Sequence, residues 1–120
     1  MIVSRNSDVE YRTVTSVEGL PVSGSAKVKP LLQGDEMTIM QMVYAEGASS
    51  PMHSHDHESL LYVISGKVQA IVGEETFTLQ PGDVCRHPIG VPHNVQALEQ
   101  STFLEVKSPA PSLEQFASTQ

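Results

Sequence analysis

Short segments rich in Val, Ile, Thr, Phe and Tyr, separated by glycine and proline, run through most of this chain, and helical periodicity is almost absent. This pattern is typical of an all-β sandwich or barrel. At the turn Gln80-Pro81-Gly82-Asp83, proline presets φ and glycine accepts a positive φ, as a type II turn requires. The pattern predicts strands near residues 26–32, 36–45, 60–64, 68–72, 75–79, 84–87, 94–97 and 101–106.

The chain has 120 residues, which suits one domain, because two domains would each be too small to bury a core. We therefore expect a single domain over 1–120, with a core barrel at about 26–107. Residues 1–25 are polar and form an arm or an edge strand. Residues 108–120 form a short tail, in which two prolines end the last strand and SPAPSLEQF has room for one helical turn.

Charge and composition exclude several classes of partner. The chain has 14 acidic and 7 basic residues, a net charge of -7, and no basic cluster, which argues against nucleic-acid binding. Its longest apolar run, 60–64, is far too short to span a membrane, and the first residues do not resemble a signal peptide. Cys85 is the single cysteine and excludes an intrachain disulfide. We expect a cytoplasmic protein.

Three of the five histidines lie in the stretch HSHDHES, residues 53–59. In an extended strand, residues two apart share a face about 6.5–7 Å apart, so His53 and His55 can converge on one ion. Imidazole nitrogen is a common ligand of transition metals. His57 would lie about 13 Å from His53 and belongs to a predicted turn, so we favour it less.

A metal site needs at least one further protein ligand. His93 is the first candidate, because the preceding PIGVP restricts its backbone, and His87 is the competitor.

Around these histidines the sequence resembles the cupin superfamily, and within it the small single-domain barrels of the cupin-2 type. The first cupin motif, G-x5-H-x-H-x3,4-E-x6-G, matches at Gly47, His53, His55 and Gly66, and Ser59 stands at the position of the acid.

The second cupin motif, G-x5-P-x-G-x2-H-x3-N, matches at Gly82, Pro88, Gly90 and His93, and Ala97 replaces its final Asn. Fifteen residues separate the two motifs, the short spacing of small microbial cupins.

The resemblance implies an all-β, double-stranded β-helix (jelly-roll) cupin barrel with metal ligands at its mouth. By position, the ligands carried over are His53, His55 and His93. Ser59 stands where the usual fourth ligand, Glu or Gln, would be. Glu58 lies one residue early and a one-residue shift turns a strand side chain to the other face, so it is less favoured unless a bulge intervenes.

The implied cofactor is one divalent transition metal, with Fe, Zn, Ni and Mn all open. A neutral residue at 59 leaves the ion its full positive charge, which attracts anions and acidifies bound water. The resemblance therefore predicts an enzyme that acts on a small molecule, anionic substrates included. O2-dependent dioxygenase chemistry and redox-neutral isomerase or lyase chemistry are both open. The alternative is a non-catalytic cupin that binds a metal or ligand as a sensor.

Two residues are candidates for catalysis. Glu105 lies before a Ser-Pro ending, as an acid does in the similar small cupins that process unsaturated uronates, where it can transfer protons; a solvent-facing Glu105 is the alternative. Arg86 can bind a substrate carboxylate, or form a salt bridge on the surface. Cys85 is expected to be a buried small residue.

Met40, Met42 and Tyr44 share one strand face, and Met37, Ile39 and Val43 share the other; one set should line the interior.

Exposed sheet edges favour pairing with a second copy, so we expect a homodimer to which the N-terminal segment contributes.

Overall fold

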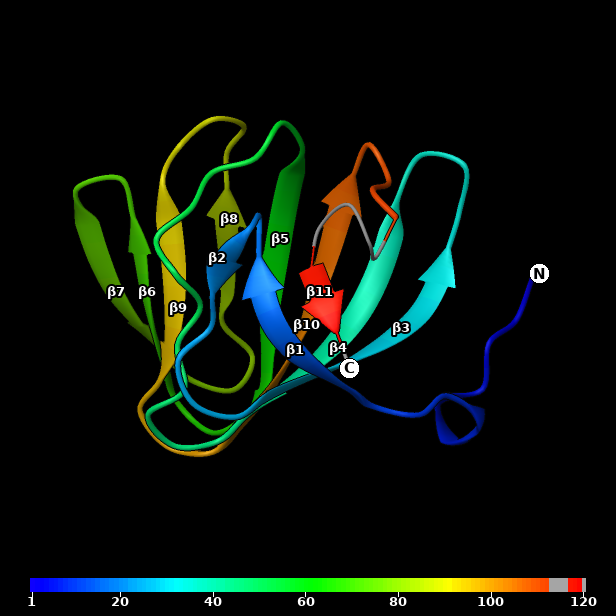
Figure 1. Ribbon diagram of the computed structural model, residues 1–120, viewed down its shortest axis with the longest axis horizontal. Helices are drawn as coiled ribbons and strands as arrows, with labels where there is room; N and C mark the ends of the chain where they lie inside the picture. Colours follow the sequence, from blue (N-terminus) through cyan, green and yellow to red (C-terminus); the bar gives the residue numbers. More distant parts are fainter. Residues whose placement is uncertain (113–116, 120) are drawn as a thin grey trace.

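The computed structural model describes residues 1–112 and 117–119, and almost all of its regular structure is antiparallel β-sheet (Figure 1). The elements are η1 (Asn6–Asp8), a 3-10 turn, and the strands β1 (Arg12–Val17), β2 (Leu20–Pro21), β3 (Ala26–Gln33), β4 (Thr38–Tyr44), β5 (Glu58–Ser65), β6 (Val68–Val72), β7 (Glu75–Leu79), β8 (Val84–His87), β9 (His93–Ala97), β10 (Ser101–Ser108) and β11 (Ala117–Thr119).

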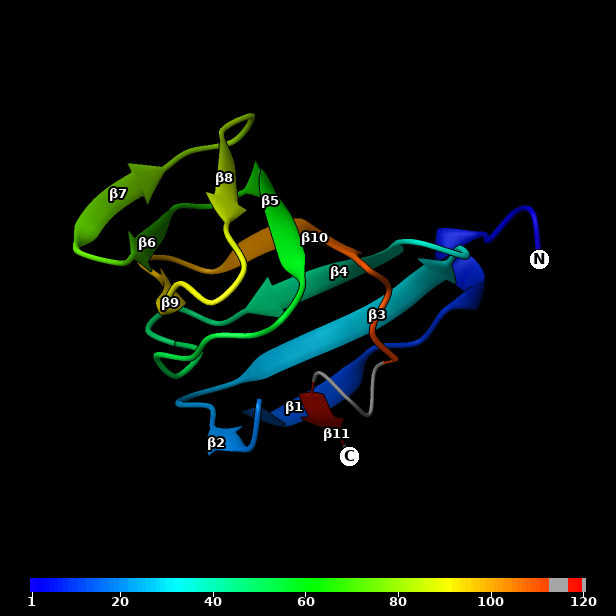
Figure 2. The ribbon, with the colours of Figure 1, turned by 90° about the horizontal axis from the view of Figure 1, so that it is seen from above.

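The strands form two sheets that curl toward each other. The larger has the order β11-β1-β3-β4-β10-β5-β8, with β2 added beside β1, and the smaller has the order β7-β6-β9. Figure 2 shows the curl from above, with β6, β7 and β9 facing the end of the larger sheet. This arrangement confirms the all-β jelly-roll barrel expected from the sequence.

The eight predicted strands all exist, with ends that differ by a few residues. Residues 1–25 contribute a sheet strand, since β1 pairs antiparallel with β3 through Arg12↔Val28 and Thr13↔Lys27. On the far side of β1 lies β11, so the larger sheet extends beyond residues 26–107 at both ends of the chain. The helical turn considered within 108–116 lies partly outside the described residues.

The barrel interior is lined by alternate residues of the strands. Met40, Met42 and Tyr44 are the inward set of β4, each at most 3% exposed. Phe103 of β10 is fully buried, and its ring meets that of Tyr44 edge-on at 5.0 Å between centroids. Burial of this apolar surface is the main favourable term in folding. Cys85 is also buried, as expected.

Two turns depend on glycine. Gly82 has φ +93°, which confirms the positive φ expected for the type II turn. Gly66, between β5 and β6, has φ +87° and lies so close to Gln100 and Ser101 that a Cβ would overlap both.

In residues 1–112 and 117–119, no helix has the length and hydrophobicity needed to span a membrane.

Candidate metal centre

His53, His55 and His93 come together inside the barrel. One ring nitrogen from each of these residues, the three-His cluster, lies within 4.8 Å of the other two. All three side chains are buried. The cluster thus brings His53 and His55 of the first motif together with His93 of the second.

The backbone brings His53 and His93 together directly. They form an antiparallel bridge, in which His53 N donates to His93 O at 3.0 Å and His93 N donates to His53 O at 2.8 Å. His93 is the first residue of β9, whereas residues 54–57 form a loop. The two side chains do converge, but the expectation that they do so by sharing a strand face was wrong. His55 lies in a loop that turns its side chain inward, and this loop is held by the hydrogen bond from Gly90 N to His55 O at 2.9 Å.

Each ring of the cluster donates from Nδ1 to a backbone carbonyl. The acceptors are Pro51 O for His53 at 2.7 Å, His57 O for His55 at 2.7 Å, and Val91 O for His93 at 3.0 Å. A carbonyl can only accept, so Nδ1 carries the proton and the lone pair of each neutral ring is on Nε2. Such a bond fixes the ring and its tautomer as metal-binding histidines require.

Burial keeps these imidazoles neutral. It lowers the pKa of His55 to about 3, with further lowering by the charge of Lys107, and it lowers the pKa values of His53 and His93. Only the neutral ring has a lone pair for a metal. The donor set therefore fits a first-row divalent transition metal, for which imidazole is a usual ligand.

His57 lies closer to the cluster than an extended chain would place it. Its ring stacks on that of His55 with centroids 3.7 Å apart and planes 6° apart. Two stacked imidazoles direct their in-plane lone pairs side by side rather than at one point, so His57 forms a wall of the site and is not part of the three-His cluster.

Ser59 and His87 occupy the region of the expected fourth ligand. Ser59 pairs with His87 across β5 and β8, and its Oγ lies 2.9 Å from His87 Nδ1. The ring of His87 stacks on His93 with centroids 4.1 Å apart. Burial lowers the pKa of His87 to about 4. His87 therefore packs against the ring of His93 and is not itself a member of the three-His cluster.

Glu58 and Arg86 face outward. Arg86 Nε donates to Glu58 Oε2 at 2.7 Å; the Arg86 side chain is largely exposed and that of Glu58 is half-buried. This matches the surface salt bridge considered for Arg86 and leaves neither residue in the barrel interior.

Glu105 faces inward and forms a buried ion pair. Its Oε2 accepts from Lys107 Nζ at 2.9 Å, and the two residues are 7% and 1% exposed. Burial by itself would raise the pKa of Glu105, but the charge of Lys107 and the hydrogen bond it donates bring that pKa down to about 2. The solvent-facing alternative for Glu105 is thus wrong, and Lys107 is an interior residue that the sequence analysis missed.

One small cavity is lined by residues of the three-His cluster, and two larger hollows lie elsewhere on the barrel. An interior cavity of about 10 Å³, room for about one water molecule, is lined by His53, His93 and Glu105 together with Tyr44, Ser50, His87 and apolar residues. A hollow of about 310 Å³ at the barrel mouth is lined by Glu18, Asp56, His57 and the segment 109–111.

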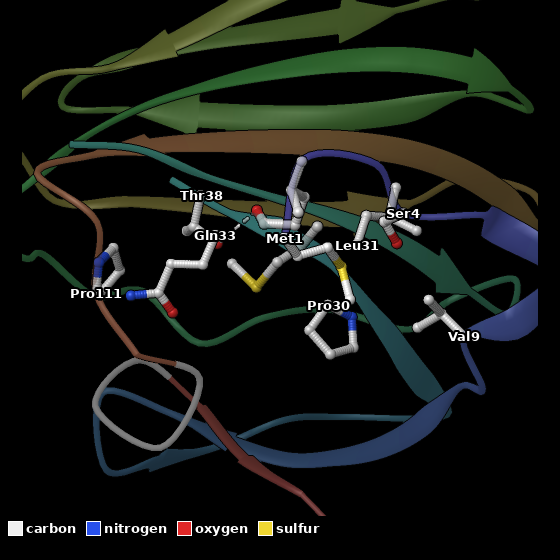
Figure 3. A pocket seen from close by; sticks show the side chains of 10 residues that line it. Met1, Ser4, Val9, Pro30, Leu31, Gln33, Thr38 and Pro111 are labelled. Atoms are coloured by element: carbon white, nitrogen blue, oxygen red, sulfur yellow. Dashed lines mark hydrogen bonds between the residues drawn. The ribbon is translucent and has the colours of Figure 1, made fainter. Parts of the chain in front are cut away.

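The third hollow, also of about 310 Å³, lies where the N-terminal segment crosses β3 (Figure 3). Its walls are mostly apolar and include Pro30 and Leu31. Thr38 and Met40 form another part of its lining, and they are the cross-strand partners of Lys107 and Glu105. The hollow therefore lies on the β3–β4 side of the strand that carries the ion pair, and neither Glu105 nor Lys107 is among its lining residues.

Comparison with known proteins agrees with this geometry. A family model described as "Cupin domain" matches residues 40–106, which include all three histidines of the cluster. No curated protein sequence matches the chain.

Three solved structures resemble the whole chain. KdgF from Halomonas sp. is 22% identical with a TM-score of 0.82, over 93% of this chain and 96% of that one. An RmlC-like cupin from Shewanella frigidimarina is 22% identical with a TM-score of 0.80, over 93% and 94%. A predicted oxalate decarboxylase from Thermotoga maritima is 20% identical with a TM-score of 0.80, over 90% and 99%. At these identities the likeness establishes the fold alone.

Proposed function

Because the chain belongs to the cupin domain family, we propose that it holds one divalent transition-metal ion between His53, His55 and His93 and acts on a small molecule there. The observation that carries this proposal is the set of three buried imidazoles, each with Nδ1–H donated to a carbonyl and its lone pair on Nε2. Such an ion would supply Lewis-acid polarisation of a substrate oxygen, or a redox centre if it is iron.

The residues around the cluster have separate tasks in this proposal. Pro51, His57 and Val91 orient the three rings through their carbonyls. Glu105 is the candidate for proton transfer, since it lies inside the barrel on the cavity shared with His53. Arg86 is set aside as a substrate-binding residue, since its side chain is exposed and bound to Glu58.

The hollows support a small-molecule substrate. The hollow at the mouth and the hollow beside the N-terminal segment each have a volume of about 310 Å³, at the lower end of the range for small-molecule sites. Glu18 and Asp56 place negative charge beside His57, which disfavours an anionic substrate in that hollow, whereas the apolar hollow has no acidic side chain in its lining.

Elemental analysis of purified, tag-free protein tests the proposal. We expect one equivalent of a single metal in the wild type and none in His53→Ala or His93→Ala. The controls Glu58→Gln and His57→Gln should keep the metal, because neither side chain belongs to the three-His cluster. Metal that survives both alanine variants, or a wild type that stays empty after anaerobic reconstitution, would contradict the proposal.

The metal then separates the two reaction classes. Iron directs the search to O2 uptake, and zinc, nickel or manganese directs it to isomerase and lyase substrates. Activity that persists without O2 excludes the dioxygenase class.

A non-catalytic sensor is the second candidate, and one observation favours it: the cavity beside His53 and His93 has room for about one water molecule. In this case a small molecule would bind tightly at the barrel mouth without turnover. Turnover that disappears in His93→Ala would exclude it.

We propose that the chain is a single domain, that the protein is cytoplasmic, and that it assembles as a homodimer. Its support is an apolar outer face on β5 and β8, where Leu60, Tyr62, Ile64 and Val84 are all exposed. The N-terminal segment lies on the outer face of β4, on the other side of β10 from this apolar face, where Asn6 Nδ2 donates to Gln41 Oε1 at 2.9 Å. Light scattering that shows only monomer at micromolar concentration would contradict the dimer.

A further inference from the structure

Glu105 is the one acid among the buried residues of 1–112 and 117–119. Removing a carboxylate from water is unfavourable by several kcal/mol, and even a good ion pair such as that with Lys107 seldom gains more than it loses. Replacing both Glu105 and Lys107 by apolar residues of similar volume would be expected to leave the fold at least equally stable. The buried pair therefore calls for an explanation other than stability of the fold.

The position of Glu105 relative to the cluster offers that explanation. Glu105, His53 and His93 line the same interior cavity, whose volume is about 10 Å³. A space of that size holds about one water molecule or one ion. A carboxylate and two candidate ligands thus border the same water-sized cavity.

Electrostatics agree with this geometry. A cation at these rings would be attracted by the Glu105 carboxylate and repelled by its partner, the Lys107 ammonium, and both effects are strong in the low dielectric of the barrel interior. Glu105 lines the cavity shared with His53 and His93, and Lys107 is not among the residues that line it, so the attraction acts at the shorter range.

The other acids near the motif are directed away from the interior. Asp56 is exposed, Glu58 is bound to Arg86 on the outside, and position 59 holds a serine whose Oγ contacts His87. The three imidazoles are neutral. Without Glu105, an ion in the cluster would keep its full charge inside the barrel.

We propose that Glu105, held by Lys107, supplies the negative charge of the metal centre from β10 across the water-sized cavity, in place of a carboxylate ligand at position 59. This inference rests on the proposed function, since it concerns the ion that the three-His cluster would hold. Outer carboxylates of this kind typically change metal affinity by about 10–100-fold when they are removed.

Titration of the metal-free protein with Co²⁺ tests the inference without any assay of activity. We expect Glu105→Gln to bind Co²⁺ about 10–100-fold more weakly than the wild type, with unchanged stoichiometry. The Co²⁺ absorption bands should shift as well, because the charge next to the coordinated groups changes. Glu105→Asp, which keeps the charge, should recover part of the affinity, and the outward-facing Glu58→Gln should bind as the wild type does.

A second variant guards against a fold that does not tolerate an unpaired lysine. Glu105→Gln/Lys107→Met removes both buried charges at once, and we expect it to bind Co²⁺ more weakly than Lys107→Met, since these two proteins differ only in the carboxylate. Wild-type affinity with an unchanged spectrum in folded Glu105→Gln, or equal affinities of Lys107→Met and the double variant, would overturn the inference. Failure of the proposed function would look different: the wild type would bind no Co²⁺, or binding would survive His93→Ala.

Discussion

Ser59 Oγ and His87 Nδ1 lie 2.9 Å apart inside the barrel, at the position where the cupin motif has an acid. Both residues are 1% exposed, and the ring of His87 stacks on the candidate ligand His93. A hydrogen-bonded pair therefore takes the place that a fourth ligand would take, and Ser59 is linked to the three-His cluster through the ring of His87.

Removal of the Ser59 hydroxyl should destabilise the protein. In Ser59→Ala the buried Nδ1 of His87 loses the partner that the structure gives it, which costs about 1–3 kcal/mol. Urea unfolding measures the change. The matched control is Ser54→Ala in the same segment, an exposed serine whose loss should change the free energy of unfolding by less than about 0.5 kcal/mol. Equal effects of the two substitutions would contradict the prediction.

Breaking the Glu105–Lys107 pair from one side should be worse than removing both charges. Lys107→Met leaves a buried carboxylate without its ammonium partner, at an expected cost of about 3–5 kcal/mol in the free energy of unfolding. Glu105→Gln/Lys107→Met should recover most of that loss, because no charge is left buried. Urea unfolding of both variants measures the difference. A double variant as unstable as the single one would show that the destabilisation has another origin.

Stability of the metal-free protein should fall below about pH 6.5. Burial lowers the pKa of His55 to about 3 and the pKa values of His57 and His87 to about 4, against 6.5 for an ordinary imidazole. Between these values the unfolded chain binds protons that the folded chain does not. Stability is therefore fully present above pH 6.5 and is lost as the pH falls toward 4.

Glu105 acts in the same direction at lower pH, since its pKa is lowered from 4.5 to about 2. Urea midpoints measured from pH 8 to pH 2 check the sign for both kinds of group. Midpoints that were the same at pH 5 and pH 7 would show that folding does not lower the pKa values of these imidazoles.

The two turn glycines should respond differently to alanine. Gly82→Ala meets no atom within 4 Å and carries only the strain of φ +93°, so we expect a loss of about 1–2 kcal/mol. Gly66→Ala adds an overlap with Gln100 and Ser101 to a φ of +87°, which raises the expected loss to about 2–5 kcal/mol. Thermal unfolding of the pair measures the difference. A smaller loss for Gly66→Ala would mean that the β10 side of the turn moves away at little cost.

Added metal should stabilise the protein in proportion to its binding. At a free Zn²⁺ concentration of one hundred times Kd, ligation of the folded state alone adds about 2.7 kcal/mol to the free energy of unfolding. We expect this rise in the wild type and none in His93→Ala, measured by thermal unfolding with and without Zn²⁺. An equal rise in both proteins would place the ion elsewhere.

The fold and the three-His cluster could be predicted because both depend on local signals. Glycine and proline mark the strand ends, and the spacing of His53, His55 and His93 within two motifs selects them from five histidines. The alternation of Met40, Met42 and Tyr44 likewise separates one face of β4 from the other, although it does not say which face is inside.

The same ambiguity explains why Lys107 was missed. On β10 the residues Thr102, Leu104 and Val106 form the more apolar face, yet they point outward and are half-buried, whereas Glu105 and Lys107 point inward. A two-residue period defines two faces, and only the neighbouring strands decide which one meets the core. The stacking of His57 on His55 could not be predicted for a related reason, because a loop conformation follows from no periodicity.

Because His53 and His93 are joined by a backbone bridge, an ion bound by their side chains would also affect how this part of the chain opens. These residues lie forty positions apart, and their paired backbone amides join the segment before β5 to the start of β9 in the smaller sheet. An ion held by both side chains would cross-link the chain at the point where the two sheets meet. Removal of the ion by a chelator should then accelerate hydrogen exchange at the His53 and His93 amides before exchange increases elsewhere. The exchange rate of these two amides would thus report whether the ion is bound.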